Sequence, residues 1–159
     1  MIKMKDVDLH VHTNASDGDL TPQQLIDKAI KNKLKAVAIT DHDTVESVES
    51  AIKYAADKKI EVIAGIEFSC EEKEQGYDEV HVIGLFIDFK NSYLLKLTQT
   101  IKEDRIKQKK EMIRKLDELG FKIDFSEVKW LVKFSFGRPH IAKILIEKYP
   151  QKFKSVQDV

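Results

Sequence analysis

The pattern that most constrains the fold is an alternation of short apolar runs with amphipathic helical stripes. Alternating or continuously apolar runs predict strands, and apolar residues three and four positions apart predict helices. The predicted strands cover residues 6–12, 35–40, 60–67 and 79–87, and the predicted helices between them cover 21–32 and 45–58. Strands alternating with helices predict an α/β fold built on a parallel sheet or barrel.

Beyond Asn91 the rhythm changes to one long helical stripe. Residues 92–119 predict a helix that Gly120 ends as a C-cap,. At 1.5 Å per residue this helix would be about 40 Å long, longer than a barrel helix needs. We therefore expect two parts: a main domain of residues 1–90 and 137–159, and a small helical insertion of residues 91–136.

Composition and charge exclude several classes of protein. Lysine plus arginine and aspartate plus glutamate number 27 each, so no overall field attracts nucleic acid or a membrane surface,. No run approaches the roughly 20 apolar residues of a membrane helix, and no signal-peptide pattern is present. The single Cys70 excludes an intramolecular disulfide and is expected to be a small buried residue,. These features predict a cytoplasmic protein with no membrane association and no obligate protein partner.

Histidines and carboxylates follow the predicted strands. Ligands in α/β folds gather at the carboxyl ends of strands. His10 and His12 are two residues apart, so on a strand both rings project from one face, with Asp17 on the next loop,. Nitrogen and oxygen donors of this kind suit a divalent transition metal. The candidate metal ligands are His10, His12, Asp17, His42, Glu67 and His81.

Some of these residues also have ordinary structural explanations. His42 could cap the helix that follows it, and His81 lies between two valines and could be a satisfied core histidine. Glu67, however, ends an apolar strand, where an unpaired carboxylate would be costly to bury unless a metal were bound. We therefore predict metal ligation by all three, with Asp41 or Asp43 orienting the His42 ring.

A second candidate site lies near the end of the chain. Arg138 begins a predicted helix, where free backbone amides and a guanidinium together suit a phosphate group,. An ordinary helix start with an exposed arginine is the simpler alternative. His140 and Ser135 are further candidates for substrate binding, the latter through its hydroxyl.

Six motifs in order resemble the PHP (polymerase and histidinol phosphatase) family of metal-dependent phosphoesterases. The motifs are HVH at 10–12, SDG at 16–18, TDHDT at 40–44, GIEFS at 65–69, EVHVIG at 79–84 and FGRPHIA at 136–142. The last is similar to the branch that contains nucleoside 3',5'-bisphosphate phosphatases and 5'-to-3' exoribonucleases. The resemblance implies a distorted (β/α) barrel that carries a small helical insertion over the active-site mouth.

The resemblance also implies a chemistry. It implies hydrolysis of nucleoside 3',5'-bisphosphates or short 5'-phosphorylated RNA by metal-activated hydroxide, using up to three divalent ions. Manganese is the expected metal, and zinc or iron would also suit the donors. By resemblance, one ion lies on His10, His12 and Glu67, a second on Glu67 and His81, and a third on Asp17 and His42, the expected catalytic pair. Arg138 would hold the phosphate oxygens, with His140 and Ser135 nearby.

One departure from the family pattern adds alternatives. Family members continue beyond this point and supply a further histidine and an Asp-x-His pair, so we expect a barrel incomplete at its C-terminus with sparse metal ligation. A non-catalytic, truncated metal-binding fragment is therefore one alternative. A histidinol phosphatase or a polymerase-associated PHP exonuclease is another, which the motif at 136–142 and the insertion disfavour.

Overall fold

The computed structural model describes residues 6–72, 77–124 and 138–158. The chain forms two compact units, residues 1–101 and 102–159, and each is described by itself. The boundary between the units falls within the long helix α3 (Ser92–Glu118). The predicted insertion of residues 91–136 stays a prediction, because part of it lies outside the described residues.

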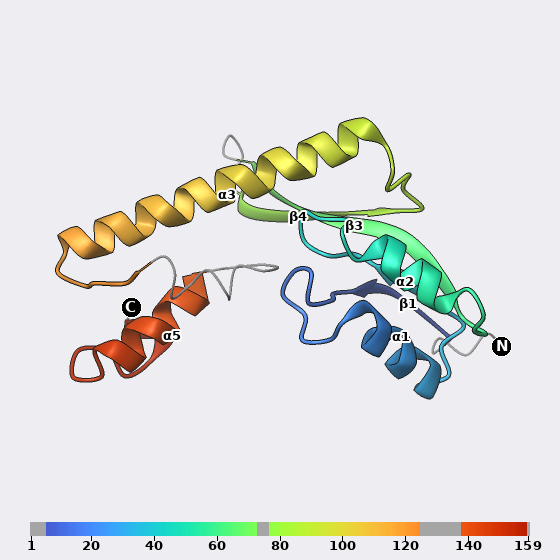
Figure 1. Ribbon diagram of the computed structural model, residues 1–159, viewed down its shortest axis with the longest axis horizontal. Coiled ribbons are helices and arrows are strands. Elements are labelled where there is room, and N and C mark those ends of the chain that lie inside the picture. The colour runs from blue at the N-terminus through green and yellow to red at the C-terminus, as the bar shows by residue number, and fades with distance from the viewer. Residues whose placement is uncertain (1–5, 73–76, 125–137, 159) are drawn as a thin grey trace. The chain divides into compact units, whose positions relative to one another are not determined.

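The first unit is built on a four-stranded sheet in the order β1-β2-β3-β4 (Figure 1). The strands are β1 (Val7–Val11), β2 (Ala36–Ile39), β3 (Glu61–Glu72) and β4 (Tyr77–Leu85). The first three are parallel, as the alternation with helices predicts. β4 instead pairs antiparallel with β3, so the expectation of a parallel arrangement is wrong for this strand. A parallel crossover needs a dozen or more residues, and only residues 73–76 separate these strands,.

Two helices cover one face of this sheet. α1 (Pro22–Lys31) begins with a capping box, in which Thr21 and Gln24 exchange side-chain-to-backbone hydrogen bonds,. α2 (Val48–Ala55) is shorter than the predicted 45–58. Its N-cap residue Ser47 does not cap the helix, because its hydroxyl donates instead to Asp41. The helices bury a core of Leu25, Ile26, Ala29, Val37, Ile39, Val45, Val48, Ala51, Ala55, Ile60 and Ile66.

On the opposite face of the sheet, the residues that the structure describes form a small apolar cluster. Ala36, Ala38 and Ile63 are buried there and Leu85 packs against them, while Val7 and Leu9 remain exposed. β3 continues five residues past its predicted end, beyond the last residue that pairs with β2, and there it pairs with β4 alone. Cys70 lies in this extension and is exposed, so the expectation that it is buried is wrong.

The second unit has its own core. The helix predicted at 92–119 is α3, and Gly120 follows it with a φ of 86°, as expected of a C-cap glycine,. α5 (Arg138–Lys148) begins at Arg138, as the sequence predicts, and a short 3-10 turn, η2 (Val156–Asp158), follows it. The buried residues of this core are Ile113, Ile123, Ile141 and Leu145. No helix in the described ranges is both long and apolar enough to cross a bilayer.

Candidate metal centre

The six predicted metal ligands come from five segments of the first unit. His10 lies in β1, with His12 directly after it, and Asp17 follows in the loop before α1. Glu67 lies in β3 and His81 in β4. The loop after β2 is bound to β3 around His42, because Asp43 N–H donates to Glu67 O (2.9 Å) and Glu67 N–H to Asp41 O (3.2 Å). The sheet ladder therefore carries these side chains to one place.

Glu67 is the centre of this cluster, and its carboxylate is almost completely buried. Oε2 lies 2.9 Å from His10 Nε2 and 3.0 Å from His12 Nε2. Oε1 lies 3.0 Å from His81 Nδ1. His42 Nδ1 is 3.6 Å from Oε2. One carboxylate thus faces four imidazole rings that come from three segments of the chain.

Asp17 lies at the edge of the cluster. Its Oδ1 is 3.2 Å from His12 Nδ1, and its Oδ2 is 3.7 Å from His42 Nε2. The rings of His12 and His42 have centroids 4.6 Å apart, and those of His42 and His81 are 4.9 Å apart. Asp17 therefore connects two histidines through different oxygens.

The donors form three overlapping groups that could each hold a metal ion. These groups are His10–His12–Glu67, His12–Asp17–His42 and His42–Glu67–His81, each with ligand atoms within 4.8 Å of one another. His12 belongs to two groups, but a neutral imidazole has only one nitrogen lone pair to offer. Glu67 belongs to two groups through two oxygens, and a bridging carboxylate can serve both.

The chemistry of the donors fits a divalent ion. Among the side chains that the structure describes, His42 Nδ1 is the one buried nitrogen or oxygen without a hydrogen-bond partner. A buried polar atom normally has a partner, and a metal would provide one here. These residues therefore suit a metal centre made of imidazole nitrogens and carboxylate oxygens.

The protonation states also favour a metal. Burial lowers the pKa of His42, although the nearby carboxylates of Glu67 and Asp17 act in the opposite direction. Burial alone would raise the pKa of Glu67, but the hydrogen bond with His10 and the charges of the neighbouring histidines outweigh it and hold this pKa below its usual value. A neutral imidazole and an ionised carboxylate are the forms that bind metal.

Asp41 and Asp43 are the two residues predicted to orient the His42 ring, and the structure disagrees for Asp41, while that role for Asp43 stays a prediction. Asp41 is fully buried, and within the described part of the chain it accepts hydrogen bonds from Thr13, Ser16 and Ser47 rather than from His42. Consecutive residues of an extended segment point in opposite directions, so the residue before His42 faces away from the cluster. Asp43 has a φ of 53° and accepts from Ser69 N–H at 3.0 Å.

The three hydroxyl residues around Asp41 were not among the predicted site residues. Thr13 directly follows the first motif, Ser16 is the first residue of the second, and Ser47 lies three residues after the third. All three are buried, which is unusual for serine and threonine,. A cluster of hydroxyl residues beside metal-ligand motifs was the only sequence signal that could have identified them.

Gly18 fixes the path of the loop that carries Asp17. Its N–H donates to Thr13 O at 3.0 Å. A Cβ at this position would lie 2.3 Å from His12 O and 2.7 Å from His12 C. Only glycine allows the loop to fold back this closely on the strand that carries the histidines.

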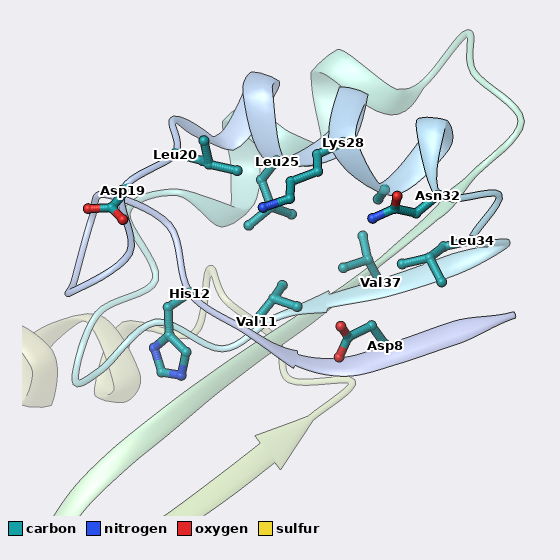
Figure 2. Close-up of a pocket in the computed structure, with 11 residues that line it drawn as sticks. Asp8, Val11, His12, Asp19, Leu20, Leu25, Lys28, Asn32, Leu34 and Val37 are labelled. Carbon is teal, nitrogen blue, oxygen red and sulfur yellow. The ribbon is translucent and has the colours of Figure 1, made fainter. Parts of the chain in front are cut away.

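A cavity of about 350 Å³ lies between β1 and α1, and His12 forms part of its wall (Figure 2). Its apolar lining includes Val11, Leu25 and Val37. Its polar residues have mixed charge and comprise Asp8, Asp19, Lys28 and Asn32. A phosphate group would require a more positive surface, so the imidazole cluster is the better candidate for phosphate chemistry.

The predicted substrate-binding residues are not placed by the structure at the level of side chains. Arg138 is the first residue of α5 and His140 the third, but the positions of their side chains lie outside what the structure describes. Ser135 lies outside the described residues altogether. Their contact with substrate stays a prediction.

The chain is similar to proteins that act on nucleic-acid components. It is 32% identical over 143 residues to a 5'-3' exoribonuclease of Haemophilus influenzae, covering 90% of this chain and 51% of that protein. It is 32% identical over 146 residues to the 3',5'-nucleoside bisphosphate phosphatase of Chromobacterium violaceum, covering 91% of this chain and 50% of that protein. The chain therefore spans about half the length of these relatives.

Solved structures agree with the fold. One is a protein from Bifidobacterium adolescentis inferred to be a metal-dependent phosphoesterase, with a TM-score of 0.78 and 27% identity, matched over 98% of this chain and 54% of that one. Another is an amidohydrolase from Chromobacterium violaceum, with a TM-score of 0.75 and 29% identity over 96% of this chain and 52% of that one. The expected α/β fold class is thereby confirmed.

The family comparison covers the whole candidate centre. The PHP domain matches residues 8–156, which include all six candidate ligands. The order of the motifs, the four-stranded α/β sheet and the similarity to exoribonuclease and phosphatase relatives agree with this match. The chain belongs to the PHP domain family.

Proposed function

We propose that this chain carries the divalent-metal centre of a phosphoesterase that hydrolyses nucleotide phosphate esters. The observation that carries the proposal is the buried carboxylate of Glu67 with imidazole nitrogens of four histidines within 3.6 Å of it. Without an ion, burying a carboxylate beside so many polar groups would carry a large desolvation cost.

The distances suggest which of the candidate ligands would share each metal ion. His10 and His12 approach Oε2 of Glu67 through Nε2, so these three residues would share one ion. His81 approaches the other oxygen, so Glu67 would bridge to a second ion. Asp17 and His42 would contribute to a third. Bound divalent ions would lower the pKa of a water molecule, orient the phosphate and stabilise the departing oxygen.

The residues of the chain would have distinct tasks around the substrate. Glu67 would keep two ion positions at a fixed separation, because its two oxygens face different histidines. Asp17 is more than half exposed and would lie nearest to an incoming phosphate, together with His42, which is the basis for assigning them catalytic roles. Arg138, with His140 and Ser135, is proposed to hold the non-bridging phosphate oxygens.

The relatives narrow the proposed substrate. Their names describe a 5'-3' exoribonuclease and a 3',5'-nucleoside bisphosphate phosphatase. We therefore infer a nucleoside 3',5'-bisphosphate or a short 5'-phosphorylated RNA as substrate. Manganese is the proposed metal, with zinc and iron as alternatives, because imidazole and carboxylate donors suit all three.

A substrate panel tests this proposal. The protein is stripped of metal, reloaded separately with manganese, zinc or iron, and assayed on nucleoside 3',5'-bisphosphates, short 5'-phosphorylated RNA and histidinol phosphate. We expect metal-dependent release of phosphate or mononucleotides from the first two substrates. The variant Glu67→Gln should lose this activity, while Glu61→Gln, an exposed glutamate at the start of the same strand, should keep it.

Two results would redirect the proposal. Turnover of histidinol phosphate with neither nucleotide substrate would favour a histidinol phosphatase. Tight metal binding without hydrolysis of any ester in the panel would favour a metal-binding chain that is not catalytic by itself.

A further inference from the structure

A buried network of polar side chains lies beside the candidate metal centre, and Asp41 is its hub. Asp41 Oδ1 accepts from Thr13 N–H and from the Ser16 hydroxyl, both at 2.7 Å. Oδ2 accepts from the Thr13 hydroxyl at 2.7 Å and from the Ser47 hydroxyl. All four residues are buried. The Asp41 carboxylate therefore has hydrogen-bond donors on both oxygens and belongs to none of the three groups of candidate metal ligands.

Most of these bonds hold one loop. Thr13 and Ser16 belong to the segment that joins His12 to Asp17, and they supply three of the four donors. Ser47 supplies the fourth and precedes α2. A buried carboxylate that lost these donors would be destabilising. The network thus ties the loop that carries Asp17 firmly to the segment after β2.

Ser16 connects this network to His12. Its oxygen is 2.7 Å from Asp41 Oδ1, but 3.4 Å from both His12 Nδ1 and Asp17 Oδ1. A hydroxyl has one proton, and the short contact to Asp41 takes it. Ser16 therefore presents only lone pairs to His12 Nδ1.

The same ring nitrogen faces a second acceptor. Asp17 Oδ1 lies 3.2 Å from His12 Nδ1. Without an ion, Glu67 Oε2 at 3.0 Å from Nε2 competes with these acceptors for the ring proton. Once an ion lies between Nε2 and Glu67, the acceptors at Ser16 and Asp17 keep the proton of the neutral ring on Nδ1, and the lone pair of Nε2 is directed at the ion. An acceptor on one ring nitrogen is the usual means of directing the other toward a metal.

We propose that Asp41 is a positioning residue for the metal centre. Acting through Ser16, it holds the loop of residues 13–17 so that His12 keeps its proton on Nδ1 and Asp17 stays beside His12 and His42. Asp41 thus controls which nitrogen of His12 is available to an ion without binding that ion. The inference rests on the proposed metal centre for its functional consequence.

Paired variants separate positioning from general stability. Asp41→Ala removes all four bonds, whereas Ser47→Ala removes one bond to the same carboxylate and leaves the loop donors in place. Both should lower the thermal stability of the metal-free protein. In manganese titration calorimetry, Asp41→Ala should bind about 10- to 100-fold more weakly than the parent, the usual loss for an outer residue of a metal site, and Ser47→Ala should match the parent.

Rescue by an isosteric residue provides a second comparison. Asp41→Asn keeps the oxygen that accepts from Thr13 N–H and Ser16. The hydroxyls of Thr13 and Ser47 can turn to accept from the new amide group. We therefore expect Asp41→Asn to recover most of the metal affinity that Asp41→Ala loses.

A spectroscopic measurement tests the tautomer in the protein loaded with zinc, a diamagnetic ion that suits the same donors. Long-range ¹H–¹⁵N NMR of the imidazole rings, recorded well above the ordinary histidine pKa of about 6.5, reports which nitrogen of His12 carries the proton. We expect Nδ1–H in the parent, in Ser47→Ala and in Asp41→Asn. Asp41→Ala and Ser16→Ala should show a raised fraction of Nε2–H.

The possible results are decisive. The inference is wrong if His12 is Nε2–H in the parent, or if Asp41→Ala keeps both the parent's tautomer and its manganese affinity. It is also wrong if Ser47→Ala weakens metal binding as much as Asp41→Ala does. If Asp41→Ala does not fold, unchanged affinity and tautomer in Ser16→Ala overturn it. A parent that binds no divalent metal refutes the proposed function instead, while the loss of thermal stability in metal-free Asp41→Ala still tests the network.

Discussion

Replacing Glu67 with glutamine should remove most metal binding while leaving the fold intact. The substitution keeps the size of the side chain and one acceptor oxygen, but it removes the charge and replaces the other oxygen with an amide donor. Glu67 belongs to two of the three donor groups, so one change affects both. Loss of an outer residue alone costs about 10- to 100-fold in metal affinity, so we expect at least about 100-fold for this bridging carboxylate.

This loss converts into a measurable thermal shift. With free metal at about 100 times its Kd, binding stabilises the folded parent by about 2.7 kcal/mol. For a chain of this size, about 1 kcal/mol corresponds to about 2–4 °C, so metal should raise the parent's Tm by about 5–11 °C. A variant that binds about 100-fold more weakly gains only about 0.4 kcal/mol at the same metal concentration, or about 1–2 °C.

The assay is differential scanning fluorimetry with and without manganese, with calorimetric titration to measure the Kd. Glu61→Gln is the matched control, since Glu61 is exposed, lies in β3 and belongs to none of the donor groups. An equal metal-induced shift in Glu67→Gln and in the parent would refute the assignment of Glu67 as a ligand. A shift lost equally in Glu61→Gln would show that the effect is not local.

Three further predictions follow from the same geometry. The double variant His10→Ala, His12→Ala should lose retained metal in elemental analysis yet keep the parent's circular dichroism spectrum; equal metal content would show that the site is misplaced. Gly18→Ala should weaken manganese binding at least about tenfold by displacing the loop that carries Asp17,, whereas Gly120→Asn, at a left-handed position with open space, should bind like the parent,. Ile26→Ala should cost about 2–5 kcal/mol in urea unfolding, because its side chain is fully buried between α1 and the sheet,; a cost under about 1 kcal/mol would contradict that packing.

The sequence predicted the first half of the fold because its signals there are local. The helix cap at Thr21, the helical stripe after it and the apolar run at 35–40 each act within a few residues. The β3–β4 hairpin was not predictable in the same way. The charged stretch at 71–75 does not resemble a strand, so β3 was expected to end at Glu67. The hairpin register places Ser69 opposite His81, which brings that histidine beside Glu67.

The candidate ligands could be recognised because few other roles suit histidines and carboxylates at strand ends. Their partners could not be recognised from order along the chain. Asp41 adjoins His42 in sequence, which suggested contact between the two side chains, yet extended backbone directs neighbouring residues to opposite sides. The hydrogen bonds of Asp41 go instead to Thr13 and Ser16, about 25 or more residues away, a pairing that only the parallel β1–β2 register creates,.

The central claim is that Glu67 and the surrounding histidines form a divalent-metal centre. The most direct measurement is an anomalous difference map from crystals grown with saturating manganese. The account predicts a strong peak within coordination distance of a Glu67 carboxylate oxygen, with His10 and His12 or with His81 as further ligands. A well-diffracting crystal with no anomalous peak at this cluster, or with manganese bound only elsewhere, would contradict the account.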